Sequence, residues 1–233
     1  MDVLIASTLE AFRLLFSGNV EIWEIIGISF RVSSFAILLA IPPALMIAFV
    51  LAYGNFFGRR FLISLFSTFL SIPAVVIGLT LFIVLSRQGP MGDLGLLFTQ
   101  TAMMMGQFVL CLPILVAMAH TSFQAADRRA WETARTLGAT RTYAFFTVLY
   151  EIRFGLMAAM LAAYGRIISE VGASMMLGGN IAHYTRNIPT AIALETSKGN
   201  FAEGIALGVV LLSLAFLLNG LLHYVQGKGS IHP

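Results

Sequence analysis

The sequence predicts an all-α polytopic membrane protein with about five transmembrane helices. Of its 233 residues, 58% are hydrophobic and 11% are charged, compared with about 45–50% and about 25% in typical globular domains. The charges leave uncharged windows at 32–58, 61–86, 94–126 and 204–227. Each window exceeds the roughly 20 residues that a helix needs to cross a bilayer. Because lipid cannot pair with backbone groups, these segments must be helices, which excludes a soluble enzyme and a nucleic-acid-binding protein.

The first residues predict a helix that lies in the membrane interface, over 1–18. Residues 3–16 are apolar but too short to span, and they carry Glu10 and Arg13. The chain starts with Met1-Asp2, without the basic residues that open a signal peptide. We therefore expect this segment to be retained.

Five spans are expected near 32–52, 61–85, 96–119, 154–177 and 203–224. Asn19 is a candidate N-cap for the helix that leads into the first span. Pro73 interrupts the second span, and Gly89-Pro90-Met91-Gly92 predicts a turn after it. The longest polar connection, 120–153, separates the third span from the fourth.

An odd number of spans places the two ends of the chain on opposite sides, and the side richer in Lys and Arg is expected to be cytoplasmic. One side has eight such residues, namely Arg59, Arg60, Lys228 and the arginines 128, 129, 135, 141 and 153. The other side has five, namely Arg13, Arg31, Arg87, Arg186 and Lys198. We expect the N-terminus outside and the C-terminus in the cytoplasm.

Common catalytic motifs are absent from the sequence. There is no GxxxxGK[ST] phosphate-binding loop, no HExxH and no GxSxG, and the four histidines are scattered. The single cysteine, Cys111, lies in an uncharged window and is interpreted as packing. We expect neither enzymatic activity nor a metal or cofactor in this chain.

The connection 120–153 predicts a short amphipathic helix near 128–138. Asp127 is a candidate cap for it, and Gly138 is placed to end it in a left-handed conformation. Trp131, Ala134 and Leu137 share one face, and Arg128, Arg129 and Arg135 surround that face. Such a helix can dock a soluble partner or lie flat on anionic headgroups, and periodicity does not separate the two.

This segment resembles the cytoplasmic EAA loop of ABC importer permeases, which reads E-A-A, three residues, G, nine residues, then I-x-L-P. Glu132-Thr133-Ala134 and Gly138 match the first half, whereas Val148-Leu149-Tyr150-Glu151 lacks the final Leu and Pro. The next helix is therefore expected to enter the membrane without the break that proline makes. The resemblance implies a coupling helix that contacts a separate ATPase subunit, formed by Arg128, Trp131, Glu132, Thr133, Ala134, Leu137, Gly138 and Ala139.

The fourth span carries a seam of small residues and two charges. Gly155, Ala158, Ala162, Gly165, Ser169 and Gly172 recur every three or four residues, which lets another helix approach closely. Arg166 and Glu170 flank the seam one turn apart, and buried charges must pair or face a polar cavity. Two interpretations stay open: an internal pair that locks the helix, or a gate in a permeation path, with Arg166, Ser169, Glu170, Gly172 and Ser174 as candidates.

Within that family, 165–176 resembles the molybdate and tungstate permeases, and 178–199 resembles the tungstate permeases specifically. This implies one transmembrane domain over 1–233, with a type I importer core, in the cell (inner) membrane. It also implies a homodimer, two ATPase subunits that hold ATP and Mg, and an extracytoplasmic tungstate-binding protein. The alternatives are molybdate or another oxyanion as cargo, an ion-coupled secondary transporter that uses Arg166 and Glu170, and, more distantly, an intramembrane enzyme.

Overall fold

The computed structural model describes residue 13, residues 18–126 and residues 128–229. Throughout these residues the regular secondary structure is helical, so the predicted all-α class is confirmed. The interfacial helix predicted over 1–18 falls almost wholly outside the described residues, and so does the candidate cap Asp127.

The helices follow one another with short connections. They are α2 (Val20–Tyr53), α3 (Arg59–Phe69), α4 (Ala74–Leu85), the 3₁₀ turn η1 (Gly92–Leu94), α5 (Gln100–Ala125), α6 (Arg128–Thr136), α7 (Arg141–Glu151), α8 (Arg153–Ile168), α9 (Gly172–Gly178), α10 (Ile188–Lys198) and α11 (Phe201–Gly229). Within the described residues, α2, α5 and α11 are long and apolar enough to cross a membrane singly. Two bent pairs, α3 with α4 and α7 with α8, raise the number of candidate spans to five.

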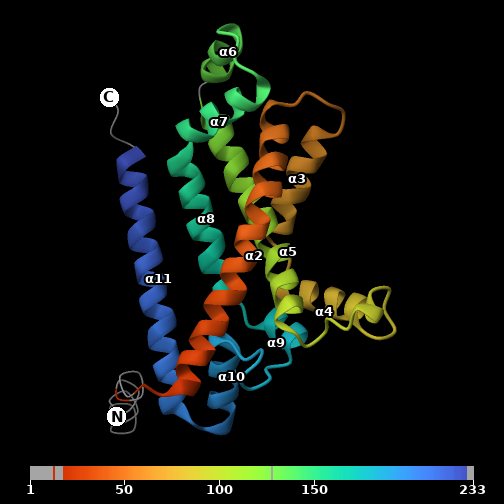
Figure 1. The fold of residues 1–233 in the computed structure, drawn as a ribbon, viewed down its shortest axis with the longest axis vertical. Coiled ribbons are helices and arrows are strands. Elements are labelled where there is room, and N and C mark those ends of the chain that lie inside the picture. Colours follow the sequence, from red (N-terminus) through yellow and green to blue (C-terminus); the bar gives the residue numbers. More distant parts are fainter. Residues whose placement is uncertain (1–12, 14–17, 127, 230–233) are drawn as a thin grey trace.

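The long helices run side by side, and the short ones close the two ends of the bundle (Figure 1). Helices α6 and α7 lie at one end, and α10 lies at the other. The first turn of α2 and the last turn of α11 are at opposite ends, as an odd number of crossings requires. Helix α4 lies across the direction of the long helices and projects from the side of the bundle (Figure 1).

The second predicted span is not one straight helix. Helix α3 ends at Phe69, and α4 starts after Pro73 at an angle of 100° to it. Pro73 has extended backbone (ψ 131°) and no N–H to continue a helix, so it acts as the N-cap of α4. The expected interruption at Pro73 is confirmed, but the sharp turn of α4 was not anticipated.

The fourth predicted span, 154–177, is wrong as a single helix, because α8 ends at Ile168 and α9 is separate. The Glu170 carboxylate accepts the backbone N–H of Gly172 at 3.0 Å. A side chain thus replaces the backbone partner that a continuous helix would supply, and it starts a new helical turn.

The entry into that span also differs from the prediction. Helices α7 and α8 meet at 72° although no proline lies between them. Ile152 adopts φ −89° and ψ 11°, which ends α7. The Arg153 guanidinium donates to the Tyr150 carbonyl at 2.7 Å and lies 4.2 Å from the centre of the Tyr150 ring. An arginine therefore stabilises a break that the family's motif assigns to proline.

The core is built on a close contact between α2 and α5. Ala36, Ala40, Ala44 and Ala48 recur every fourth residue of α2, and all four are fully buried. Small side chains at this spacing let the helix backbones approach closely, which is how membrane helices gain packing contacts without a hydrophobic driving force. The α2–α5 pair thereby forms the frame on which α8 and the α6–α7 connection rest.

Candidate functional site

Helix α6 ends in a Schellman motif, as the sequence predicted. Gly138 has φ +87°, and its N–H donates to the Arg135 carbonyl at 3.2 Å. The Ala139 N–H donates to the Ala134 carbonyl at 3.0 Å. These two bonds satisfy carbonyls that a helix end leaves unpaired, and only glycine adopts the left-handed position without strain.

A second cap and one arginine turn α6 and α7 into a stiff hairpin. Thr140 accepts the Tyr143 N–H with its hydroxyl at 3.3 Å and so starts α7. Arg135 donates from Nη1 to the Ala139 carbonyl at 2.5 Å, across the turn. The turn between the two helices is therefore hydrogen bonded on both sides of Gly138.

Trp131, which the sequence placed on the docking face of the helix, contacts the end of α2. Its ring lies 5.3 Å from that of Phe49 and 5.6 Å from that of Tyr53, both near the end of α2. Phe49 in turn contacts Phe123 and Phe145. Aromatic rings at these distances add packing energy beyond the area that they bury. Trp131 is half-buried, and its ring packs α6 against the end of α2.

Other predicted residues of α6 are more exposed than Trp131. Leu137 is 82% exposed, and Glu132 and Thr133 are also exposed. Ala134 and Ala139 are half-buried under the hairpin. Arg128 begins α6, and its side chain lies outside what the structure describes. A cavity of about 520 Å³ lies beside the contact between α6 and the end of α2, with Trp131, Glu132, Arg135 and Arg141 on its wall.

The predicted Arg166–Glu170 pair is formed, with Nη1 and Oε2 at 2.5 Å. The two partners differ in burial, because the Arg166 side chain is 46% exposed and that of Glu170 is 9% exposed. The second oxygen of Glu170 accepts the Gly172 N–H. This geometry supports the locking interpretation, since the pair fixes the break between α8 and α9.

The remaining gate candidates surround this break. Ser169 is exposed, and its hydroxyl lies 3.0 Å from the Gly165 carbonyl. A Cβ on Gly172 would stand 2.6 Å from Val75 Cγ2 of α4, so glycine is required there for packing. Ser174 is buried, and its hydroxyl has no partner among the described residues. The seam predicted along one helix is therefore divided between α8 and α9.

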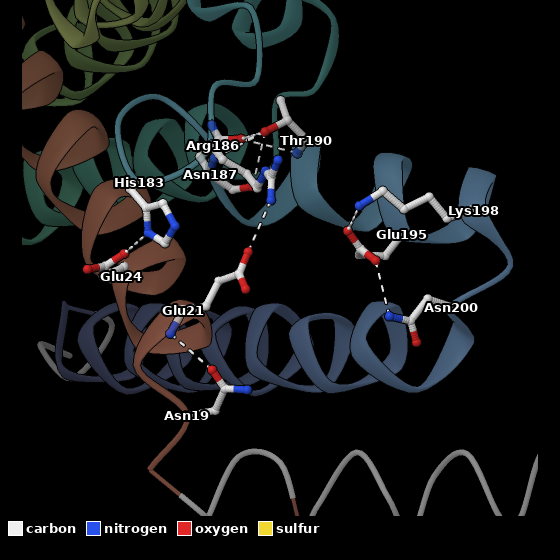
Figure 2. A network of polar contacts seen from close by, with 10 residues as sticks. All are labelled: Asn19, Glu21, Glu24, His183, Arg186, Asn187, Thr190, Glu195, Lys198 and Asn200. Atoms are coloured by element: carbon white, nitrogen blue, oxygen red, sulfur yellow. Dashed lines mark hydrogen bonds and ion pairs between the residues drawn. The ribbon is translucent and has the colours of Figure 1, made fainter.

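The opposite end of the molecule holds a polar network that the sequence did not single out (Figure 2). His183 Nδ1 lies 2.6 Å from Glu24 Oε2, and Arg186 Nη1 lies 3.2 Å from Glu21 Oε1. Both pairs join the loop before α10 to the first turns of α2. The hydrogen bond that His183 donates to the Glu24 carboxylate raises the pKa of His183 above its ordinary value.

Helix α10 was missed by the sequence analysis. Asn187 and Thr190 form a capping box, and Glu195 accepts Lys198 Nζ at 2.7 Å and Asn200 Nδ2 at 3.2 Å (Figure 2). The hydrogen bond from Lys198 lowers the pKa of Glu195. The signal was present in Asn187-Ile188-Pro189-Thr190, where a cap residue precedes a proline in the first turn.

A bundle of helices long and apolar enough to cross a membrane, with a two-helix hairpin at one end, is the architecture of an integral membrane protein. The chain belongs to the family described as the inner membrane component of binding-protein-dependent transport systems, which matches residues 40–228. It is 38% identical over 226 residues to the tungstate uptake system permease protein TupB of Campylobacter jejuni, with 97% of this chain and 95% of the relative covered.

Two further comparisons agree with that assignment. The chain is 40% identical over 203 residues to a probable anion ABC transporter permease protein of Haloferax volcanii, with 85% of this chain and 88% of the relative covered. Among solved structures, a chain of the inward-facing MetNI methionine ABC transporter matches with a TM-score of 0.56 and 17% identity, covering 90% of this chain and 91% of that one. At that identity the match concerns the fold alone, and it confirms the predicted type I importer core.

Proposed function

We propose that this chain is the permease subunit of an ATP-driven importer that carries tungstate into the cytoplasm. The observation that carries the proposal is the near full-length match to the Campylobacter jejuni protein, whose name assigns it to tungstate uptake. The match to a probable anion transporter supports the same chemical class of cargo.

The complete transporter has further subunits. Two copies of the permease form the path, two ATPase subunits hold ATP and Mg, and an extracytoplasmic protein delivers the anion. The end that carries α6 faces the cytoplasm, and the end that carries α10 faces outside. The excess of arginine around α6 and α7 supports this orientation.

Coupling is assigned to the α6–α7 hairpin. The exposed Leu137, Glu132 and Thr133 contact the ATPase, while Trp131 holds the hairpin on the end of α2. Because the turn at Gly138 is hydrogen bonded and α6 is anchored by aromatic packing, a push on α6 moves α2 and α7 together. The motion then reaches α8 through the bend at Ile152.

Tight binding of the anion within the permease is not needed. A deep energy well in the path would slow release, so selectivity is assigned mainly to the external binding protein. Arg166 and Glu170 act in this scheme by holding the break between α8 and α9.

The test is uptake of labelled tungstate by cells with and without this chain, challenged with molybdate and with sulfate. Loss of high-affinity tungstate uptake on deletion, restored by the gene, is the expected result, with sulfate uptake unchanged. Equal tungstate uptake in both strains, after other tungstate systems are deleted, would favour molybdate or another oxyanion. Copurification of a P-loop ATPase distinguishes this machine from an ion-coupled transporter.

A further inference from the structure

A groove between α3 and α5 lies outside the site already described. Its volume is about 450 Å³, and it extends from the end of α2 along α3 to Leu70. Four polar side chains line it, namely Ser67, His120, Thr121 and Gln124, and its other lining residues are apolar. The two helices that form it, α3 and α5, both reach the end of the molecule that carries α6 (Figure 1).

The polar side chains of this groove are unusual for a surface that faces lipid. His120 lines the groove but is largely buried, and its Nε2, which the protein covers, has no hydrogen-bond partner among the described residues. Gln124 is exposed on the last turns of α5. A polar group placed against hydrocarbon without a partner costs free energy, so such groups in membrane helices face water, protein or a transported solute.

The charge around the groove is of one sign. No Asp or Glu is among its lining residues. Arg59 and Arg60 are the first two residues of α3. Arg59 lies next to the groove, because its guanidinium donates to the carbonyl of the lining residue Leu51 at 2.6 Å. A mouth with fixed positive charge above an uncharged lining attracts an anion without trapping it.

Helix α3 has no side chain buried within this chain. Ser64, Ser67 and Thr68 are all exposed on it, at the spacing of neighbouring positions on a helix surface. The Ser67 and Thr68 hydroxyls donate back to carbonyls one turn earlier, at 3.0 Å and 2.9 Å, so neither hydroxyl is without a hydrogen bond. They can rotate toward a passing solute, because a hydroxyl hydrogen is free to turn.

We propose that the α3–α5 groove, with Ser67, His120, Thr121 and Gln124, lines the inner half of the path by which the oxyanion leaves the permease. The groove supplies neutral hydrogen-bond donors to the anion, and Arg59 and Arg60 draw it toward the cytoplasm. The inference rests on the proposed function for the identity of the cargo, but the geometry of the groove does not depend on it.

The first experiment measures access to the groove without using the cargo. Ser67→Cys and Thr121→Cys are placed in a Cys111→Ala background, and the whole transporter is assembled in inside-out membrane vesicles. Two methanethiosulfonate reagents of similar size are applied, one with a sulfonate and one with a trimethylammonium group. Each rate is divided by that reagent's rate with a free thiol.

Ser213→Cys is the matched control, because Ser213 is exposed on α11, which lies away from α3 (Figure 1). We expect both groove cysteines to react, and to prefer the anionic reagent by about tenfold. Tungstate on the cytoplasmic side should slow the reaction at Ser67→Cys. The Ser213→Cys variant should react with neither reagent.

The second experiment blocks the groove. Ser67→Trp should reduce tungstate uptake by about tenfold or more, with normal membrane levels and normal copurification of the ATPase, whereas Ser213→Trp should keep uptake. A wild-type transporter that carries no tungstate would contradict the proposed cargo. The labelling result would still show whether the groove is open to anions.

Three outcomes would overturn the groove assignment. Failure of Ser67→Cys to react with either charged reagent would show that lipid fills the groove. Spontaneous disulfide formation between Ser67→Cys chains, without reagent access, would show that a second copy fills it. Full uptake by Ser67→Trp would show that the anion passes elsewhere.

Discussion

Arg166 and Glu170 are paired, but the loss of the partner costs more free energy at Glu170 than at Arg166. Glu170 is buried and also caps α9, whereas Arg166 is half-exposed and can reach water. Removing Arg166 therefore leaves a buried carboxylate without its charged partner, whereas removing Glu170 leaves a guanidinium that water can solvate. The sequence identified the pair from its spacing of four residues, but not this asymmetry, because burial depends on neighbouring helices.

The asymmetry leads to a stability prediction. Arg166→Leu should lower the free energy of unfolding by about 1–3 kcal/mol, since a buried acceptor loses its charged donor. Arg166→Leu with Glu170→Gln should be less destabilised, because a neutral amide oxygen can still accept the Gly172 N–H. Thermal unfolding of the purified permease in detergent measures both. A double variant as unstable as the single one would contradict the locking role.

His183 gives a prediction of pH dependence. Its pKa is raised by the hydrogen bond to Glu24, so the contact between the loop and α2 is fully present below the ordinary pKa of about 6.5 and is lost as pH rises through the raised value. Amide hydrogen exchange of residues 181–187, corrected for intrinsic rates, should therefore be faster at alkaline pH.

His183→Asn is the control for this measurement. His183 has φ +58°, and asparagine tolerates that left-handed backbone while losing the titratable group. Exchange of the variant should be fast at every pH between about 5 and 9, since no charge forms on the side chain. An equal pH profile in wild type and variant would exclude the ion pair as its cause.

At the scale of elements, Gly138 and Gly27 form a matched pair. A Cβ added at either glycine would meet no other atom within 4 Å, but only Gly138 has a positive φ, +87°. Gly138→Val should therefore strain the α6–α7 turn by at least about 1–2 kcal/mol. Gly27→Val lies within α2 and should be nearly neutral, because valine is a better helix former than glycine.

The readouts are ATPase copurification and tungstate uptake by the assembled transporter. Both should fall with Gly138→Val, because the hairpin no longer presents α6 correctly, and both should persist with Gly27→Val. Normal copurification and uptake with Gly138→Val would remove the coupling role from this turn.

Trp131 and Leu137 belong to the same hairpin, but we expect their substitution to affect different properties, stability for Trp131 and ATPase association for Leu137. Trp131→Ala should lower the thermal stability of the permease alone, because its ring packs on Phe49 and Tyr53. Leu137→Ala should leave that stability unchanged and weaken ATPase association, since the side chain is 82% exposed. Thermal unfolding and copurification of both variants separate the roles. If Trp131→Ala instead weakened ATPase association and left stability unchanged, Trp131 would be the docking anchor.

The elements that the sequence predicted well are those with strong local signals. The helix of α6 and its glycine end follow from residues within one turn. The breaks at Ile152 and Ser169 depend instead on side chains that bond to nearby backbone groups, Arg153 at the first and Glu170 at the second. The hydropathy pattern does not reveal such breaks, because they depend on which backbone groups these side chains contact.

The whole molecule was predictable in outline, because four uncharged windows and one further apolar segment, 154–177, are each long enough to cross a bilayer. The direction of α4 was not predictable, since it depends on packing against α9, where a Cβ on Gly78 would stand 2.9 Å from Ala173 Cα. The α3–α5 groove was missed for the same reason, because its walls come from segments about fifty residues apart in the sequence.

Orientation is the property of the whole molecule that remains to be measured. The bundle has α6 at one end and α10 at the other, and the chain carries more arginine around α6. We expect the α6 end in the cytoplasm, because positive residues are retained on that side during insertion. Single cysteines at Met91, Ile181 and Thr140, in a Cys111→Ala background, report on it.

Met91 and Ile181 are both exposed, and Thr140 is exposed in the α6–α7 turn. In intact cells with a permeabilised outer layer, an impermeant maleimide should label Met91→Cys and Ile181→Cys but not Thr140→Cys. Thr140→Cys should react once the membrane is lysed, which shows that the thiol itself is accessible. The opposite labelling would invert the molecule, put α6 outside the cell, and make contact between this hairpin and a cytoplasmic ATPase impossible.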